Sequence, residues 1–272
     1  MTNAVTQRVG IAGFGTVGRE VCAVLSAGIH GLTLTAVAVR DVAESIDSLA
    51  TLGIRDLVTS SFEELAECVD IVVECAPAAL LRQIAEPILK RGRTLVVLSA
   101  GALLEMPDLI KLAKSKGGRI LVPSGSILGL DAICAAAEGR IESIRMVTRK
   151  PPASLAGAPY LVDQGNKLER LTAPLRVFCG TPREAAIGFP ANVNVAAAVY
   201  LAGAGAKSMK FEIWADPTIL RNMHSLEIEC DSGRLSMTIE NIASANPRTS
   251  SIAARSLVAL LRKLHAPLAI GT

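Results

Sequence analysis

The first half of the chain alternates continuous apolar runs with amphipathic segments, and this pattern constrains the fold more than any other feature of the sequence. Apolar runs rich in Val and Ile are typical of parallel strands covered on both faces, and the segments between them are typical of crossover helices. The alternation predicts an α/β fold with a doubly wound parallel sheet over roughly the first 125 residues. The expected strands are residues 8–13, 32–39, 56–60, 70–76, 94–101 and 119–123.

The second half has a different pattern. Its strand-like segments alternate apolar and polar residues, as strands with one buried face do. The last two are separated by Asp-Ser-Gly, which is a hairpin signal. This half predicts a smaller α+β domain with an antiparallel sheet. The expected strands are residues 141–150, 210–216, 224–230 and 234–241.

These two patterns divide the chain into three parts. Residues 1–126 are expected to form the parallel-sheet domain, and residues 127–245 the smaller α+β domain. Residues 246–272 contain a helix that we expect to pack back on the first domain. Helix starts are predicted at Ser61, which has Glu64 three residues later in the form of a capping box, and at Thr181.

Composition argues against several classes of function. The 28 basic and 25 acidic residues leave a net charge of only +3, without a basic run or an aromatic platform, so neither nucleic acid nor a membrane is expected as a partner. The six cysteines are scattered without a CxxC pair, which favours reduced thiols and no metal site. The N-terminus does not look like a secretory signal, and the longest apolar helical stretch is too short to cross a bilayer, so a cytoplasmic location is expected.

The segment GFGTVG, from Gly13 to Gly18, is a GxGxxG motif between an expected strand and an expected helix. In such a turn, Gly13 allows a tight bend, Gly15 lets the backbone approach a pyrophosphate, and Gly18 permits close helix–strand contact. The pyrophosphate would lie at the helix N-terminus, where Thr16 and Val17 begin the first turn. The motif predicts a dinucleotide site; a turn that serves packing alone, or a methyltransferase cofactor, are the alternatives.

The second expected strand ends in Arg40 and Asp41, at the position where such domains contact the adenosine ribose. Asp41 could accept hydrogen bonds from the ribose hydroxyls of NAD, and Arg40 could pair with the 2′-phosphate of NADP. We therefore expect NAD or NADP as the cofactor. The alternative is that Arg40 is only a solvent-facing residue.

Five further segments carry a resemblance to a known family. Together with the glycine turn, and in the same order along the chain, they resemble the L-aspartate dehydrogenase family. The resemblance implies a Rossmann domain plus a catalytic α+β domain, a homodimer, and NAD(P)-dependent oxidation of L-aspartate to iminoaspartate, which can yield oxaloacetate and ammonia or feed NAD biosynthesis. The segments are LSAGAL (98–103), VPSGSILGLDAI (122–133), TRKPP (148–152), GFPANVNVAAA (188–198) and WADPTILRNMHSLEIE (214–229).

The resemblance also assigns roles to individual residues. It makes His224 the catalytic residue and Asn192 a nicotinamide-binding residue, with Asn194 two positions later. It places Ser126 at a cofactor contact where the family usually has alanine, so the detail of this contact differs from the family pattern.

Other residues are candidates from chemistry. A neutral imidazole at His224 suits proton transfer near neutral pH, although a histidine on an apolar strand face is also typical of a core. Lys150 and Arg221 could hold the carboxylates of the substrate. Asn222 or Asp216 could orient the imidazole.

Two other functions remain open from the sequence. One is an NAD(P)-dependent dehydrogenase of another small amino or hydroxy acid. The other is a catalytically inactive dinucleotide-binding protein with a regulatory role.

Overall fold

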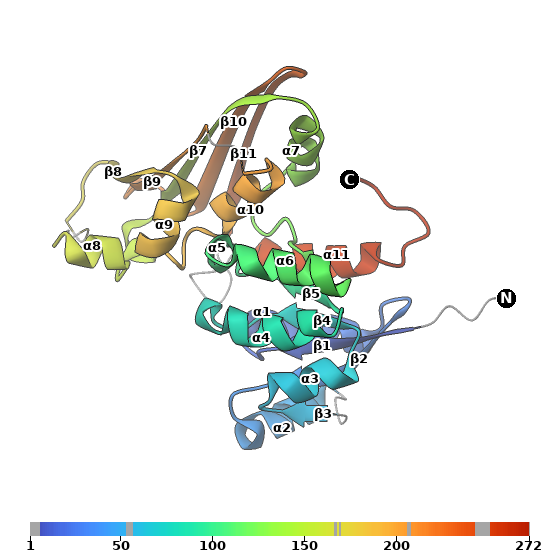
Figure 1. Cartoon of the computed structure of the whole chain (residues 1–272). Coiled ribbons are helices and arrows are strands. Elements are labelled where there is room, and N and C mark those ends of the chain that lie inside the picture. Colours follow the sequence, from blue (N-terminus) through green and yellow to red (C-terminus); the bar gives the residue numbers. More distant parts are fainter. Residues whose placement is uncertain are drawn as a thin grey trace. The chain divides into compact units, whose positions relative to one another are not determined.

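The chain forms two compact units in a computed structural model that describes residues 6–52, 57–165, 168, 170–205, 208–242 and 251–271. The first unit comprises Met1–Pro123 and Ala254–Ala269, and the second comprises Ser124–Ala253 and Ile270–Thr272. Each unit has its own sheet (Figure 1). The boundary expected at residues 245–246 lies outside the described residues.

The first unit contains a six-stranded sheet of order β3-β2-β1-β4-β5-β6. Each neighbouring pair is parallel, so the prediction of a doubly wound parallel sheet is confirmed. The strands are β1 (Gln7–Ala12), β2 (Leu32–Ala38), β3 (Leu57–Thr59), β4 (Ile71–Glu74), β5 (Thr94–Val97) and β6 (Arg119–Leu121).

Helices cover this sheet because its strands are apolar on both faces. On one face Ile11 and Val73 share a core with Leu257 and Leu261 of the C-terminal helix α11. On the other face β1 carries Gly10, where an added Cβ would lie 2.8 Å from the side chain of a leucine in α3. The helices are α1 (Thr16–Ala27), α2 (Val42–Thr51), α3 (Phe62–Cys68), α4 (Leu81–Lys90), α5 (Ala100–Leu104), α6 (Pro107–Lys116) and α11 (Ser251–Lys263), with a short 3-10 turn η1 (Ala78–Leu80).

The two predicted helix starts differ in how they are capped. The hydroxyl of Thr181 accepts from the Glu184 backbone N–H, and the Glu184 carboxylate accepts from the Thr181 backbone N–H, which is a complete capping box. The hydroxyl of Ser61 accepts from the Glu64 backbone N–H, but the Glu64 carboxylate bonds to the hydroxyl of Thr59. Only half of the box expected at Ser61 therefore forms, because Thr59 competes for the same carboxylate.

The second unit contains a five-stranded sheet of order β11-β10-β7-β9-β8. Three of its pairs are antiparallel, as expected, but β7 and β9 pair in parallel, so the sheet is mixed. The chain between these two strands runs through several helices and returns in the same direction, which a hairpin cannot do. The strands are β7 (Ile141–Lys150), β8 (Leu175–Gly180), β9 (Met209–Ala215), β10 (Asn222–Cys230) and β11 (Gly233–Asn241).

In Figure 1 the helices of the second unit lie on one side of its sheet. The strands place Ile144, Met146, Leu226 and Ile228 in an apolar core on that side. We call this the inner face. The helices are α7 (Leu130–Ala137), α8 (Pro159–Asp163), α9 (Pro182–Gly188) and α10 (Asn194–Ala202), with a short 3-10 turn η2 (Pro152–Leu155).

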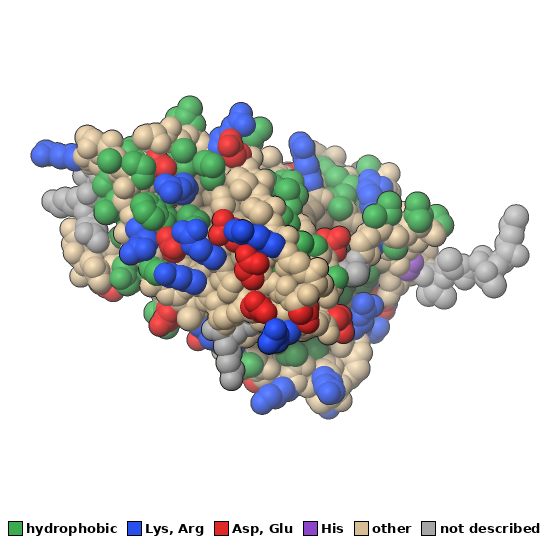
Figure 2. Space-filling view, turned by 90° about the horizontal axis from the view of Figure 1, so that it is seen from above, with side chains coloured by type: hydrophobic (Ala, Val, Ile, Leu, Met, Phe, Trp, Pro, Cys, Tyr) green, Lys and Arg blue, Asp and Glu red, His purple; other side chains and the backbone are tan. Residues whose placement is uncertain are grey.

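The described residues were searched for membrane-spanning helices and for metal-binding groups. None of their helices combines the length and the apolar composition that a membrane crossing requires. Their His, Cys, Asp and Glu side chains form no group of three or more that could hold a metal ion. Figure 2 shows basic and acidic side chains next to one another over the middle of one face of the molecule.

Candidate active site

The glycine turn follows β1 and leads into α1, as the motif requires. Gly13 has a φ of 103°, and an added Cβ there would lie 2.7 Å from the Cys75 carbonyl oxygen. At Gly18 an added Cβ would lie 2.1 Å from the Gly13 carbonyl oxygen. At Gly15, by contrast, an added Cβ would meet nothing within 4 Å. Gly13 and Gly18 are therefore required by packing, whereas the space beside Gly15 is open to a ligand.

The start of α1 has the properties of an anion site. Gly15 is the N-cap and offers no side-chain cap, so the first backbone N–H groups of the helix are left to another acceptor. Thr16 is exposed and Val17 half-buried in this first turn. A pyrophosphate fits this geometry, because free N–H groups and the helix dipole both favour negative charge. These residues therefore suit the diphosphate of NAD or NADP.

A buried carboxylate near the glycine turn joins the carboxyl ends of β4 and β5. Glu74, at the end of β4, has no exposed surface, and its oxygens accept from the backbone N–H groups of Leu98 and Ser99 and from the Ser99 hydroxyl, at 2.9–3.1 Å. Burial raises the pKa of Glu74, and these donors act against that rise. Glu74 therefore ties the loop after β5 to the end of β4.

Arg40 and Asp41 are exposed where the chain leaves β2. Asp41 is the N-cap of α2, and its Oδ1 accepts from the Glu44 backbone N–H at 3.1 Å. One carboxylate oxygen is therefore engaged in a helix cap, a role that the sequence analysis did not foresee.

The inner face of the second sheet becomes polar at one end. Thr148 and Lys150 continue the inner face of β7, and Asn222 and His224 continue that of β10. Asn241 lies opposite Asn222 on β11. All five side chains are buried. We call these five residues the polar end of the second sheet, and they are the candidate active site.

His224 is only 3% exposed. Its Nδ1 lies 2.9 Å from the Thr148 hydroxyl, which is the residue opposite it on β7. Burial, and then the positive charge of Lys150, lower the pKa of His224 to about 3. The imidazole is therefore neutral at physiological pH and lies near an ammonium group.

Lys150 is 5% exposed, and its Nζ donates to the Asn192 side-chain oxygen at 2.6 Å. Asn192 lies in the turn before α10, where its backbone N–H donates to the Phe189 carbonyl. Burial lowers the pKa of Lys150 to about 8. Among the described residues no carboxylate lies within ion-pair distance of this amine. A buried cation without a counter-ion is a site that favours a bound anion.

Asn241 connects the polar end to the loop that contains Ser126. Its side-chain nitrogen donates to the Ser126 carbonyl oxygen at 2.9 Å, and Asn241 itself is 3% exposed. The family resemblance points to Ser126, whereas no sequence pattern pointed to Asn241. The alternation along β11 places Asn241 on the same face as Ile239, which is the signal that could have identified it.

The remaining residues predicted from the sequence are not among the five residues of the polar end. Asn194, the first residue of α10, is half-buried, and Arg221 is exposed immediately before β10. Asp216 does not orient the imidazole: its two oxygens accept from Arg149 and from Thr218. The partner of the imidazole Nδ1 is the hydroxyl of Thr148, to which the sequence assigned no role.

The other two histidines have no such surroundings. His30 is exposed, and the Nε2 of His265 lies 2.8 Å from the Gln7 side-chain oxygen within the first unit.

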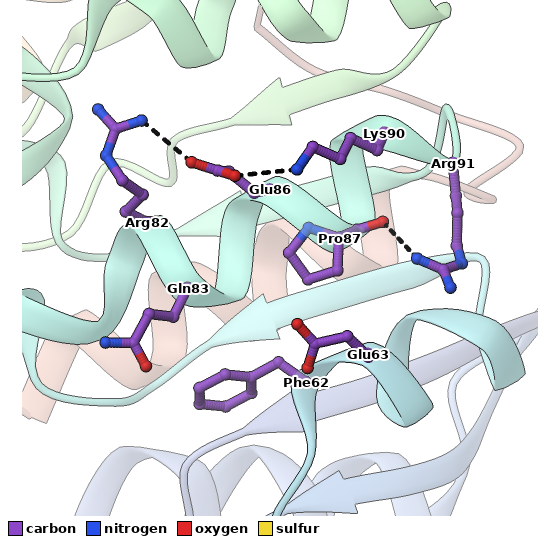
Figure 3. A pocket seen from close by; sticks show the side chains of 8 residues that line it. All are labelled: Phe62, Glu63, Arg82, Gln83, Glu86, Pro87, Lys90 and Arg91. Carbon is purple, nitrogen blue, oxygen red and sulfur yellow. Dashed lines mark hydrogen bonds and ion pairs between the residues drawn. The ribbon is translucent and has the colours of Figure 1, made fainter.

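A surface pocket of about 480 Å³ lies on the first unit, between α3 and α4. Figure 3 shows that its charged side chains mostly bond to one another, as Glu86 does with Arg82 and Lys90. None of the candidate site residues lines this pocket, so its size alone does not make it the active site.

Comparisons with known proteins cover nearly the whole chain. The family described as "Aspartate dehydrogenase, C-terminal" matches residues 131–264, and that described as "Homoserine dehydrogenase, NAD binding domain" matches residues 13–123. An L-aspartate dehydrogenase of Bradyrhizobium diazoefficiens is 52% identical over 97% of this chain and 94% of the relative. L-aspartate dehydrogenase 3 of Bordetella bronchiseptica is 49% identical over 97% of each. The crystal structure of an aspartate dehydrogenase from Thermotoga maritima has the same fold, with a TM-score of 0.76 at 24% identity over 97% of this chain and 99% of that one.

Proposed function

This chain belongs to the aspartate dehydrogenase family, and from that premise we propose that it catalyses the NAD(P)-dependent oxidation of L-aspartate. The observation that carries the proposal is the buried ammonium of Lys150, which has no carboxylate partner among the described residues, close to the neutral imidazole of His224. A dicarboxylic amino acid presents an anion to the first group and an ionisable amine to the second.

The first unit supplies the cofactor site. The open backbone at Gly15 and the uncapped start of α1 suit the pyrophosphate. We assign Arg40 and Asp41, which follow β2, to the adenosine ribose. When bound, the nicotinamide accepts a hydride. We assign Asn192 and Ser126 to the nicotinamide side of the cofactor, in keeping with the family pattern.

Lys150 is assigned to a substrate carboxylate. An ammonium within a buried site forms a charge-assisted hydrogen bond, which is stronger than a neutral one. One Nζ hydrogen is committed to Asn192, and an ammonium has three, so the amine can bond a carboxylate without releasing Asn192. Arg221 and Asn194 are the further candidates for the second carboxylate.

His224 is assigned to proton transfer. Oxidation removes a hydride from Cα of the substrate and a proton from its ammonium group, and the proton passes to the imidazole. The product is the iminium form of iminoaspartate. Addition of water and loss of ammonium then give oxaloacetate, and reductive amination is the same path in reverse. A carboxylate bound at Lys150 offsets the positive charge that disfavours protonation of His224.

Three further points belong to the proposal. Iminoaspartate is a reactive product, and its use in NAD biosynthesis is the role that the family suggests. A cytoplasmic location is supported by six free cysteines, which are typical of a reducing compartment. A homodimer is expected from the family, and size-exclusion chromatography with light scattering tests it.

The direct test is an assay of the purified protein with L-aspartate and either NAD⁺ or NADP⁺, following absorbance of the reduced cofactor. D-aspartate, L-glutamate, L-malate and L-homoserine serve as matched alternative substrates. We expect turnover with L-aspartate and little with the others. Turnover only of malate or homoserine would contradict the proposal, and cofactor binding without turnover of any substrate would favour a regulatory protein.

A further inference from the structure

We propose that Thr148 is the positioning residue of His224: its hydroxyl holds the imidazole through Nδ1 and so reserves Nε2 for the substrate. This inference rests on the catalytic role proposed for His224. Thr148 begins the TRKPP segment of the resemblance, but neither the resemblance nor the sequence pattern assigned it a role.

The sheet fixes the two side chains relative to each other. Thr148 on β7 is directly opposite His224 on β10, within a continuous antiparallel ladder that runs from Met223 paired with Arg149 to Ile228 paired with Ile144. Both side chains point to the inner face, where Thr148 is 1% exposed. The 2.9 Å contact between its hydroxyl and Nδ1 is therefore shielded from competing water. A bond set by strand register holds the ring in one orientation.

A hydroxyl suits this position better than a carboxylate does. A carboxylate at Nδ1 would lie near Lys150 and would neutralise the charge assigned to the substrate. Within the described ranges, no Asp or Glu forms an ion pair with either His224 or Lys150. A threonine hydroxyl is uncharged and can both donate and accept a hydrogen bond. It can therefore keep its contact with Nδ1 in either neutral tautomer of the ring.

The alternative is that the hydroxyl merely satisfies a buried ring nitrogen and has no effect on catalysis. Thr148→Val separates the two, because valine keeps the branched shape and removes only the hydroxyl. Thr148→Ser restores the hydroxyl. Thr238→Val is the matched control: Thr238 lies in the same sheet, on β11, and bonds to Ser225 on the exposed side.

Two readouts are measured for each variant. The first is kcat and KM for L-aspartate. The second is the ¹⁵N spectrum of the imidazoles in protein labelled with ¹⁵N-histidine, which reports tautomer and hydrogen bonding directly. The chain has only three histidines, so His30→Gln and His265→Gln variants suffice to assign the His224 signals.

We expect Thr148→Val to shift the Nδ1 signal of His224 and to lower kcat roughly three- to tenfold, the size of one ordinary hydrogen bond, with little change in KM. Thr148→Ser should restore both, and Thr238→Val should change neither. Unchanged His224 signals and kcat in folded Thr148→Val would overturn the proposal. If the valine variant does not fold, Thr148→Ala against Thr148→Ser gives the same comparison.

The spectrum also separates this inference from the proposed function. If the parent protein does not oxidise L-aspartate, the proposed function fails, whereas a His224 signal that depends on the Thr148 hydroxyl still supports the positioning role. If the signal is independent of that hydroxyl in an active enzyme, only the positioning role fails.

Discussion

The two sheets offer ligands different kinds of chemistry. The first is buried on both faces, so its side chains are occupied with packing, and what it presents is backbone N–H at the start of α1. The second is covered by helices on one face, and at one end of that face its side chains change from apolar to polar. A binding site made of backbone N–H groups is therefore damaged by adding side-chain atoms, and a binding site made of side chains is damaged by removing them.

The two units also differ in the partners that surround their buried charged side chains. The Glu74 carboxylate is surrounded by donors from Leu98 and Ser99, so its charge serves the structure. The Lys150 ammonium has an amide oxygen as its partner, and none of the described carboxylates compensates it. Since an uncompensated buried charge destabilises a fold, its presence at Lys150 is best explained by a ligand.

The largest expected effect comes from removing the imidazole. His224→Ala should lower kcat by roughly 10² to 10⁴, the usual contribution of a general acid or base, because the variant lacks the imidazole assigned to proton transfer. Cofactor binding, followed by fluorescence of NADH or NADPH, should remain nearly intact, since the glycine turn is in the other unit. Unchanged turnover would exclude His224 from the mechanism.

The second largest effect is expected from replacing Lys150, and it tests the contrast between the buried charges of Lys150 and Glu74. Lys150→Met should raise KM for L-aspartate roughly 10- to 100-fold, the value of a hydrogen bond to a charged group. The same variant should be more stable than the parent by about 1–4 kcal/mol in urea unfolding at pH 7, because a buried cation is replaced by an apolar chain. A loss of both stability and affinity would indicate that Lys150 is a structural residue.

The matched comparison is Glu74→Gln. This change keeps the size of the side chain and removes the charge that the three donors stabilise. It should lower stability, in the opposite direction to Lys150→Met. Variants that shift stability in the same direction would remove the distinction between the two buried charges.

The sequence predicted local features better than it predicted contacts between distant segments. Gly13, Gly15 and Gly18 are interpretable because strand, turn and helix are consecutive, so a short motif specifies their geometry. The family resemblance, now confirmed by close relatives, pointed to His224 and Asn192. Neither route revealed Thr148 or Asn241, because their roles depend on strand register.

Strand pairing was also the part of the fold that the sequence predicted least well. The parallel pairing of β7 with β9 joins segments separated by several helices, and nothing in either strand alone specifies it. The short strand β8 was also missed, because Leu175–Gly180 lacks a clear alternation and its partner β9 begins many residues later. Alternation shows which side chains share a face, but it does not show which strand lies next to which.

A smaller effect is expected in the glycine turn, where two substitutions should separate packing from binding. Gly15→Ala adds a Cβ in open space at a φ of −78°, so stability should change by less than about 0.5 kcal/mol. Cofactor affinity should nevertheless fall on the order of tenfold, because the methyl group occupies the approach of the pyrophosphate.

Gly18→Ala is the counterpart. It places a Cβ 2.1 Å from the Gly13 carbonyl and should destabilise the protein by about 1–3 kcal/mol. Thermal unfolding and cofactor titration of both variants provide the check. Equal loss of stability in the two would mean that Gly15 also serves packing.

The smallest effect should appear in the pH dependence of substrate binding. Lys150 has a pKa of about 8 in the folded protein, so its ammonium form is lost as pH rises through that value. The fraction charged falls roughly fourfold between pH 7 and pH 8.5, and KM for L-aspartate should rise by about the same factor. Between pH 7 and pH 8.5 the Lys150 amine binds fewer protons in the folded protein than in the unfolded chain, where a lysine has a pKa near 10.5. The free energy of unfolding should therefore rise over this pH range. Opposite trends in affinity and stability identify Lys150 as the titrating group, and Lys150→Met should lose both. If KM stayed flat in the parent enzyme, the substrate carboxylate would have to bind elsewhere, and Arg221, whose guanidinium can bond a carboxylate through two N–H groups, would become the first candidate.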